Sequence, residues 1–119
     1  MARNGKADVE HYAAMLSAMG AAPRLRIMRL LLSAHPDGLV VGDIAAESGI
    51  SGSTLSHHLD KLKAVRLVQV RRESTFLRYI VNTEALTQLL EFLYAECCTR
   101  SSAVSSRAIV RVEDLRAKG

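Results

Sequence analysis

Length, composition and charge already exclude several classes of protein. The chain has 119 residues, 49% of them hydrophobic, so it can form one folded domain without disulfides, and disorder throughout is excluded. No apolar run approaches the roughly 20 residues needed to cross a bilayer, and the N-terminal residues lack the apolar core of a signal peptide. We therefore expect a cytoplasmic protein without a membrane partner. The formal charge of +4 favours a polyanionic partner.

The first third of the chain predicts two helices. Residues 8–19 carry apolar side chains at i, i+3, i+4 and i+7, and Gly20 is a typical residue to end this helix. Pro23 suits the first turn of a second helix, which is expected to continue to about Ala34. Residues 35–38, His-Pro-Asp-Gly, have the composition of a turn.

The next two segments predict a helix-turn-helix. Residues 39–49 predict a short amphipathic helix closed by Gly49. Ser51 then stands where a hydroxyl can cap a second helix, whose buried stripe consists of Leu55, Leu59 and Leu62. A helix, a tight turn and a second helix are the arrangement used to place a recognition helix in DNA.

The exposed face of this second helix carries short polar side chains and a lysine: Ser53, Thr54, Ser56, His57 and Lys61. Small hydroxyls and an imidazole let a helix approach the base edges of a major groove, and the N–H groups at its start favour phosphate. An ordinary amphipathic helix would show the same leucine stripe. The preceding helix and turn favour the DNA-binding interpretation.

After the recognition helix the pattern changes from a helical period to alternation. Residues 67–72 and 77–81 interleave polar and apolar side chains around Glu73-Ser-Thr75, which predicts a β-hairpin. Arg71 and Arg72 lie on it, so the hairpin is interpreted as a basic wing that reaches phosphate or the minor groove. The alternative is that its arginines only solvate an exposed sheet face.

A last helix is predicted from Thr83, taken as its cap, with a leucine stripe at residues 86, 89, 90 and 93. So small a domain cannot bury both terminal helices and leave the recognition helix free, so we expect homodimerisation through them. The expected organisation is one domain over residues 1–98 and a tail over 99–119 of unassigned structure. The fold class is mainly α with a small β-hairpin, in the order α-α-α-α-β-β-α.

Two adjacent cysteines, Cys97 and Cys98, follow the last helix stripe. They cannot build a disulfide framework, and they indicate a reducing compartment and thiol chemistry. The sequence contains no glycine-rich phosphate loop, paired carboxylates in an apolar setting or Ser/His/Asp constellation. We therefore expect neither enzymatic activity nor an organic cofactor.

The order of elements, with Ser56-His-His-Leu59 and Leu67-Val-x-Val-x-Arg-Arg-Glu73, resembles the ArsR/SmtB family of metal-responsive winged-helix repressors over roughly residues 10–98. The resemblance implies a dimeric repressor that leaves its operator when an inducer binds. It also implies that Ser53, Thr54, Ser56 and His57 face bases and phosphates, that His58 is the motif histidine, and that Arg72 is a wing arginine.

The chain also departs from this family's patterns. One arsenic site of the family uses two cysteines, and the matching residues here, Val40-Val-Gly-Asp-Ile44, contain none. The family's zinc site needs histidines on the last helix, and residues 83–96 contain no histidine. Two usual glycines are Ser74 and Arg66, so positive backbone φ there would cost roughly 1 kcal/mol each.

Cys97 and Cys98 are therefore the expected inducer site. Some arsenic-responsive members carry such a pair and a third cysteine, whose position here is Val104. Soft thiolates suit arsenic(III) or antimony(III), and with two sulfurs the site needs an outside donor or an arsenical such as methylarsenite. The alternative is that the two cysteines are only small buried residues of the dimer interface.

Two other functions compete with an arsenical-released repressor. One keeps the repressor but makes the cysteines a redox or persulfide switch, which strain in a disulfide between neighbours disfavours. The other is a winged-helix module that binds proteins rather than DNA, which the basic wing disfavours.

Overall fold

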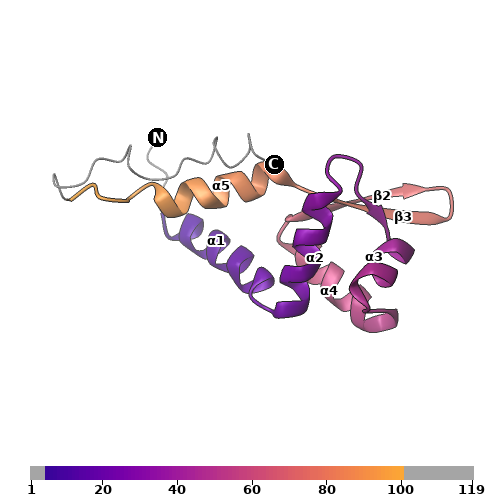
Figure 1. The fold of residues 1–119 in the computed structure, drawn as a ribbon. Helices are drawn as coiled ribbons and strands as arrows, with labels where there is room; N and C mark the ends of the chain where they lie inside the picture. The colour runs from indigo at the N-terminus through magenta and orange to yellow at the C-terminus, as the bar shows by residue number, and fades with distance from the viewer. Residues whose placement is uncertain (1–4, 101–119) are drawn as a thin grey trace. The chain divides into compact units, whose positions relative to one another are not determined.

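The structure is a computed structural model and describes residues 5–100. The chain divides into two compact units, one up to Thr83 and one from Glu84 onward. The elements run in the order α1 (Lys6–Met19), α2 (Ala22–Ser33), β1 (Leu39–Val40), α3 (Val41–Ser48), α4 (Gly52–Ala64), β2 (Val68–Glu73), β3 (Phe76–Val81) and α5 (Thr83–Tyr94) (Figure 1). The predicted winged helix-turn-helix order is confirmed, with one strand added.

The added strand makes the sheet three-stranded, in the antiparallel order β1-β3-β2. Sequence analysis placed Leu39 and Val40 at the start of a helix, which was wrong, because they pair with Tyr79 and Arg78 of β3. A two-residue strand has too few positions to show alternation. Gly38 makes the pairing possible, because it has φ 74° and a side chain there would collide with the Tyr79 carbonyl oxygen.

The core of the first unit lies between the helices and one face of the sheet. The predicted stripe of α4, Leu55, Leu59 and Leu62, is fully buried. It packs with apolar side chains of the other elements of that unit, Ile27, Met28, Leu31, Ile44, Leu67, Val68, Tyr79 and Val81, all buried. Complete burial of such side chains stabilises a fold by about 1.5–3 kcal/mol each. The leucine stripe therefore fixes which side of α4 remains available to solvent.

The helix ends match the predicted boundaries more closely than the predicted caps. Gly49 ends α3 in the left-handed conformation at φ 75°, as its position suggested. Gly20 has a right-handed φ of −74°, so no left-handed cap ends α1. Ser51 is the N-cap residue of α4, but its hydroxyl makes no capping hydrogen bond. Thr83 is the first helical residue of α5 and does not precede the helix, so its assignment as the cap was wrong.

The end of α4 forms a Schellman motif without glycine. Arg66 has φ 66°, its N–H donates to the Lys63 carbonyl at 3.0 Å, and the Leu67 N–H donates to the Leu62 carbonyl at 3.1 Å. Leu62 and Leu67 are both fully buried, which supplies the apolar contact typical of this motif. Ser74, in the two-residue hairpin turn, has φ 58°. The expected positive φ at both positions is confirmed.

The second unit consists of α5, apart from its first residue, and the turns that follow it. Leu89 is 1% exposed, whereas Leu93 and Tyr94 are 51% and 45% exposed. The predicted leucine stripe is therefore divided between buried and open positions. Within the described part of the chain, no helix is long and apolar enough to cross a membrane. The apolar cluster at residues 108–115, Val104 and the proposed tail beyond residue 100 lie outside the described residues.

Candidate nucleic-acid interface

The helix-turn-helix consists of α3, the turn at residues 49–51, and α4. The left-handed Gly49 reverses the chain, and the Ile50 N–H donates to the Ser48 hydroxyl at 3.1 Å. The turn is therefore held by a side chain from the end of α3. This geometry fixes the start of α4, where four N–H groups of a helix lack intrahelical partners.

The predicted DNA-facing residues of α4 lie together on its open side. Ser53, Thr54, Ser56, His57 and Lys61 are all exposed. At about 100° per residue they spread over roughly 160° of the helix surface, and the three buried leucines lie opposite. Small side chains near the start leave the helix axis free to approach a groove, and Lys61 adds positive charge further along. The structure thus brings these five residues onto one face.

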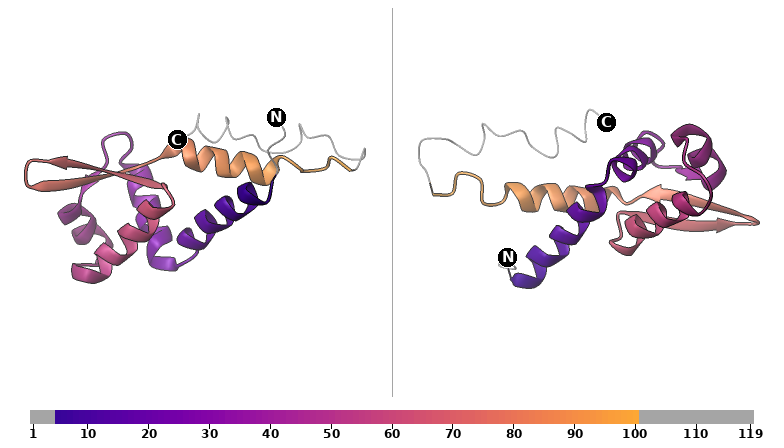
Figure 2. Two further views of the ribbon diagram at one scale, coloured as in Figure 1. Left: turned by 180° about the vertical axis from the view of Figure 1, so that it is seen from behind. Right: turned by 90° about the horizontal axis from the view of Figure 1, so that it is seen from below.

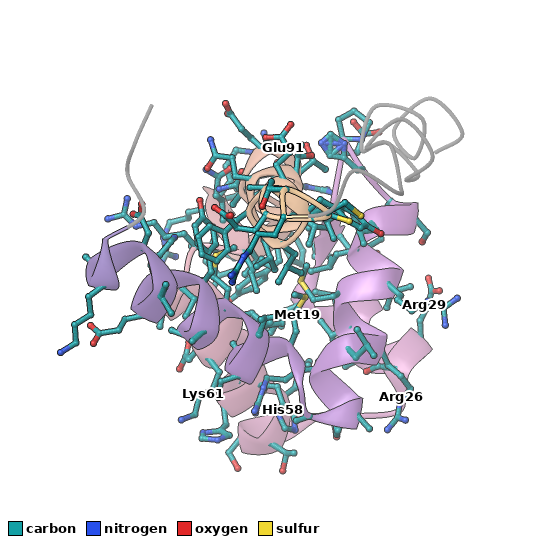
Figure 3. All side chains as sticks on the ribbon, turned by 90° about the vertical axis from the view of Figure 1, so that its left-hand side faces the viewer. Met19, Arg26, Arg29, His58, Lys61 and Glu91 are labelled. Carbon is teal, nitrogen blue, oxygen red and sulfur yellow. The ribbon has the colours of Figure 1, made fainter. Side chains whose placement is uncertain are left out.

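His58 differs from its neighbour His57 and faces the protein. Arg24 of α2 donates from Nη1 to His58 Nδ1 at 3.2 Å, and the Arg24 Nε–H donates to the Ala18 carbonyl at the end of α1. Figure 3 shows His58 beside the connection between α1 and α2, whereas Arg26 and Arg29 point away from α2. One arginine therefore joins three helices, including the recognition helix.

The contact with Arg24 assigns the proton of neutral His58 to Nε2, because Nδ1 accepts. Partial burial lowers the pKa of His58, and the positive charges of Arg24 and of protonated His57 lower it further. The neutral imidazole is thus favoured at physiological pH. Sequence analysis missed Arg24 because it lies 34 residues from its partner and no short-range pattern links them.

The wing is the β2–β3 hairpin, residues 68–81, and it extends beyond the helices of its unit (Figure 2). Its alternation places Arg72 on the same face as the buried Val68 and Tyr79, and Arg71 on the opposite face. Both arginines are exposed. The two predicted wing contacts therefore point to opposite sides of the hairpin.

Glu73 ties two wing arginines together. Its Oε2 accepts from Arg71 Nε at 3.0 Å and Nη2 at 2.8 Å, and its Oε1 accepts from Arg78 Nε at 2.9 Å. These hydrogen bonds, those from Arg78 first, lower the pKa of Glu73. Arg72 makes no ion pair with any described residue. Charge on the wing is thus partly compensated at Arg71 and uncompensated at Arg72.

The two cysteines follow α5 rather than ending it, because the helix stops at Tyr94. Both thiols are free and half-buried, their sulfurs are 3.2 Å apart, and Cys98 has φ 63°. The hydrogen bond with Cys98 raises the pKa of Cys97. Among the described residues no group of three His, Cys, Asp or Glu side chains could hold a metal ion. Within residues 5–100 the site therefore has two adjacent sulfur donors and no third His, Cys, Asp or Glu donor.

Comparison with known proteins places the chain among bacterial regulators. The family model "Bacterial regulatory protein, arsR family" matches residues 23–70, from α2 into the wing. Nodulation protein NolR of Rhizobium meliloti is 35% identical over 104 residues, which cover 87% of this chain and 83% of NolR. The chain belongs to the ArsR family. ArsR members are DNA-binding transcriptional regulators, which agrees with the open face of α4 and the wing.

Two further ArsR-family comparisons bear on fold and ligand. The homodimeric winged helix-turn-helix DNA-binding domain Mb0332 of Mycobacterium bovis has a TM-score of 0.60 and 27% identity, covering 88% of this chain and all of that one. The putative arsenical resistance operon repressor ArsR2 of Halobacterium salinarum is 39% identical over 79 residues, 66% of this chain and 65% of ArsR2. These relatives carry different stated roles, so membership in the family leaves the inducing signal open.

Proposed function

We propose that this ArsR-family regulator is a homodimeric repressor that binds a twofold-symmetric operator and is released by a trivalent arsenical or antimonite at Cys97 and Cys98. The observation that carries the DNA-binding part is the α4 face of short polar side chains opposite a fully buried leucine stripe. Ser53, Thr54, Ser56 and His57 contact base edges and phosphates in the major groove, and Lys61 contacts phosphate. Arg71 and Arg72 reach different phosphates, because they lie on opposite faces of the wing.

Dimerisation is supported by apolar surface that the chain leaves open. Val9 and Leu16 are 53% and 44% exposed and lie one above the other on α1, seven residues apart. Leu93 of α5 is 51% exposed. The similar domain Mb0332 is homodimeric. Two copies present two recognition helices, so the operator has half-sites about one helical turn apart.

The DNA-binding part is tested by titrating labelled duplexes, the DNA upstream of the gene and an unrelated sequence, at several salt concentrations. Ser56→Ala and His57→Ala lower affinity for the operator by about 5- to 100-fold per lost base contact and leave unrelated DNA nearly unaffected. Arg72→Ala weakens both and makes log K less steep in log salt by about one. Ser17→Ala on the exposed surface of α1 is the matched control. Equal losses on both duplexes would place Ser56 and His57 away from the bases.

The inducer part is supported by two free thiols whose sulfurs are already 3.2 Å apart. Methylarsenite needs two As–S bonds: each thiol proton leaves with an arsenic hydroxyl as water, and no oxidant is required. Arsenite or antimonite keeps one hydroxyl or takes a small thiol as its third donor. A coupling of about 3 kcal/mol between this site and DNA corresponds to roughly 150-fold weaker operator binding.

The inducer test adds methylarsenite, arsenite or antimonite to the protein–operator complex. The wild type releases DNA, whereas Cys97→Ser and Cys98→Ser keep operator affinity and lose most of the response, because one thiolate cannot chelate. Release from the double serine variant would remove these cysteines as the sensor.

A second candidate keeps the repressor and makes the same thiols a redox or persulfide switch. It is favoured by the direct contact of the two sulfurs. It is opposed by the strain of a disulfide between adjacent residues. Release by a persulfide donor but by none of the arsenicals would select this function.

A further inference from the structure

The wing contains a carboxylate placed where a DNA phosphate would bind an arginine. Glu73 Oε2 accepts two hydrogen bonds from the Arg71 guanidinium, from Nε at 3.0 Å and from Nη2 at 2.8 Å. Arginine offers the same fork of N–H donors to carboxylates and to phosphates. Glu73 therefore occupies, within the free protein, the position that a phosphate would take on Arg71.

The sheet register explains why a carboxylate is needed there. Arg71 lies directly opposite Arg78 in the β2–β3 ladder, and like charges in opposite positions destabilise a sheet. Glu73 is two residues beyond Arg71 on the same face and contacts both guanidinium groups. Hydrogen bonds from Arg78 and then from Arg71 lower the pKa of Glu73, because they favour its charged form.

The two arginines are held to different degrees. The Arg78 side chain is 27% exposed, and its Nη1 also donates to the carbonyls of Asp37 and Gly38 at 3.4 and 3.3 Å. The Arg71 side chain is 58% exposed, and its only described partner is Glu73. Exposed ion pairs contribute little and are screened by salt. Arg71 can therefore leave Glu73 at low cost, while Arg78 stays fixed to the loop before β1.

We propose that Glu73 is a positioning residue that weakens the contact of the wing with DNA. When the protein binds, Arg71 exchanges the Glu73 carboxylate for a backbone phosphate, while Arg78 keeps Glu73 in place. This inference rests on the proposed DNA-binding function. After the exchange, the Glu73 carboxylate lies near the phosphates and attracts a cation. This cost offsets part of the binding free energy gained from the contact between Arg71 and phosphate. Because phosphate contacts carry no sequence information, Glu73 weakens binding to the operator and to unrelated DNA alike, and unrelated DNA reports the effect without base contacts.

The test measures binding to an unrelated duplex across a salt series. Glu73→Gln tightens this binding by about fivefold, the upper range for an exposed ion pair, and makes log K steeper in log salt by up to about one. In an Arg71→Ala background the same substitution has little effect, because the remaining partner of Glu73, Arg78, stays held by the Asp37 and Gly38 carbonyls. Glu10→Gln, an equal charge change on the exposed surface of α1, is the matched control.

A second measurement follows the arginine Nε–H signals by NMR as the unrelated duplex is added. The Arg71 signal shifts and the Arg78 signal stays. The inference is overturned if Glu73→Gln leaves the affinity unchanged or lowers it, if its gain persists without Arg71, or if the Arg78 signal moves instead. A wild type that binds no duplex at all would overturn the proposed function itself, which separates the two failures.

Discussion

Removing the Arg24 side chain should loosen the recognition helix without touching its DNA face. In Arg24→Ala two hydrogen bonds are lost, one to the Ala18 carbonyl and one to His58 Nδ1. Hydrogen bonds to charged groups contribute about 1.5–3 kcal/mol each, and we take the lower end because Arg24 is only half-buried. The expected loss is therefore about 3 kcal/mol in the free energy of unfolding.

The assay is urea unfolding followed by circular dichroism, at one protein concentration because association with a second copy adds stability. Arg26→Ala, two residues along α2 and exposed, is the matched control and should stay within about 0.5 kcal/mol of the wild type. His58→Ala removes one of the two bonds and should cost about 1–2 kcal/mol. The double variant should lose less than the sum. If Arg24→Ala were as stable as Arg26→Ala, the arginine would not hold these helices together.

The same contact predicts a pH dependence of stability. Burial first, then Arg24 and His57, lower the pKa of His58 below its usual 6.5, so below pH 6.5 the unfolded chain binds a proton that the folded chain does not. Stability should therefore fall as pH drops through 6.5 and level off once the folded protein also protonates His58. His58→Gln should remove this step, and an unchanged profile would assign it to another group.

Four further substitutions test the fold and the assembly. Leu93→Glu, at an exposed position of α5, should give monomers in sedimentation and weak operator binding; variants that stay dimeric at micromolar concentration would contradict the proposed interface. Gly38→Ala should cost about 3 kcal/mol or more by urea unfolding, because its Cβ would collide with Tyr79 at a positive φ. Gly42→Ala on α3, with nothing within 4 Å, should be neutral or stabilising by up to about 1 kcal/mol. Ser74→Gly should raise the free energy of unfolding by about 0.5 kcal/mol, and a loss would mean that the φ of 58° carries no strain.

Two leucines of the last predicted stripe differ in burial. By sequence Leu89 and Leu93 belong to the same stripe, so both are expected at the predicted dimer interface. Leu89 is 1% exposed in the single chain, so a charge there would disrupt the fold itself. Of these two leucines, Leu93 is therefore the one at which a charge tests assembly without disrupting the fold.

Local patterns were enough for the features that depend on residues a few positions apart. The positive φ at Arg66 and Ser74 was expected from the resemblance to the ArsR/SmtB family. The buried stripe of α4, its open polar face and the wing follow from spacing along one helix or one hairpin. Such features repeat with the period of the backbone, so the order of side chains reveals them.

Contacts between distant segments had to come from the folded chain. The strand at Leu39 and Val40 exists only because β3 passes beside it, and Arg24 meets His58 only because α2 packs on α4. The register of the wing sets Arg71 against Arg78 and gives Glu73 two partners, although the residues themselves are ordinary wing charges. Hydrogen bonds and ion pairs act over a few ångströms in space regardless of separation along the chain, so packing, rather than periodicity, decides which polar side chains are available for DNA.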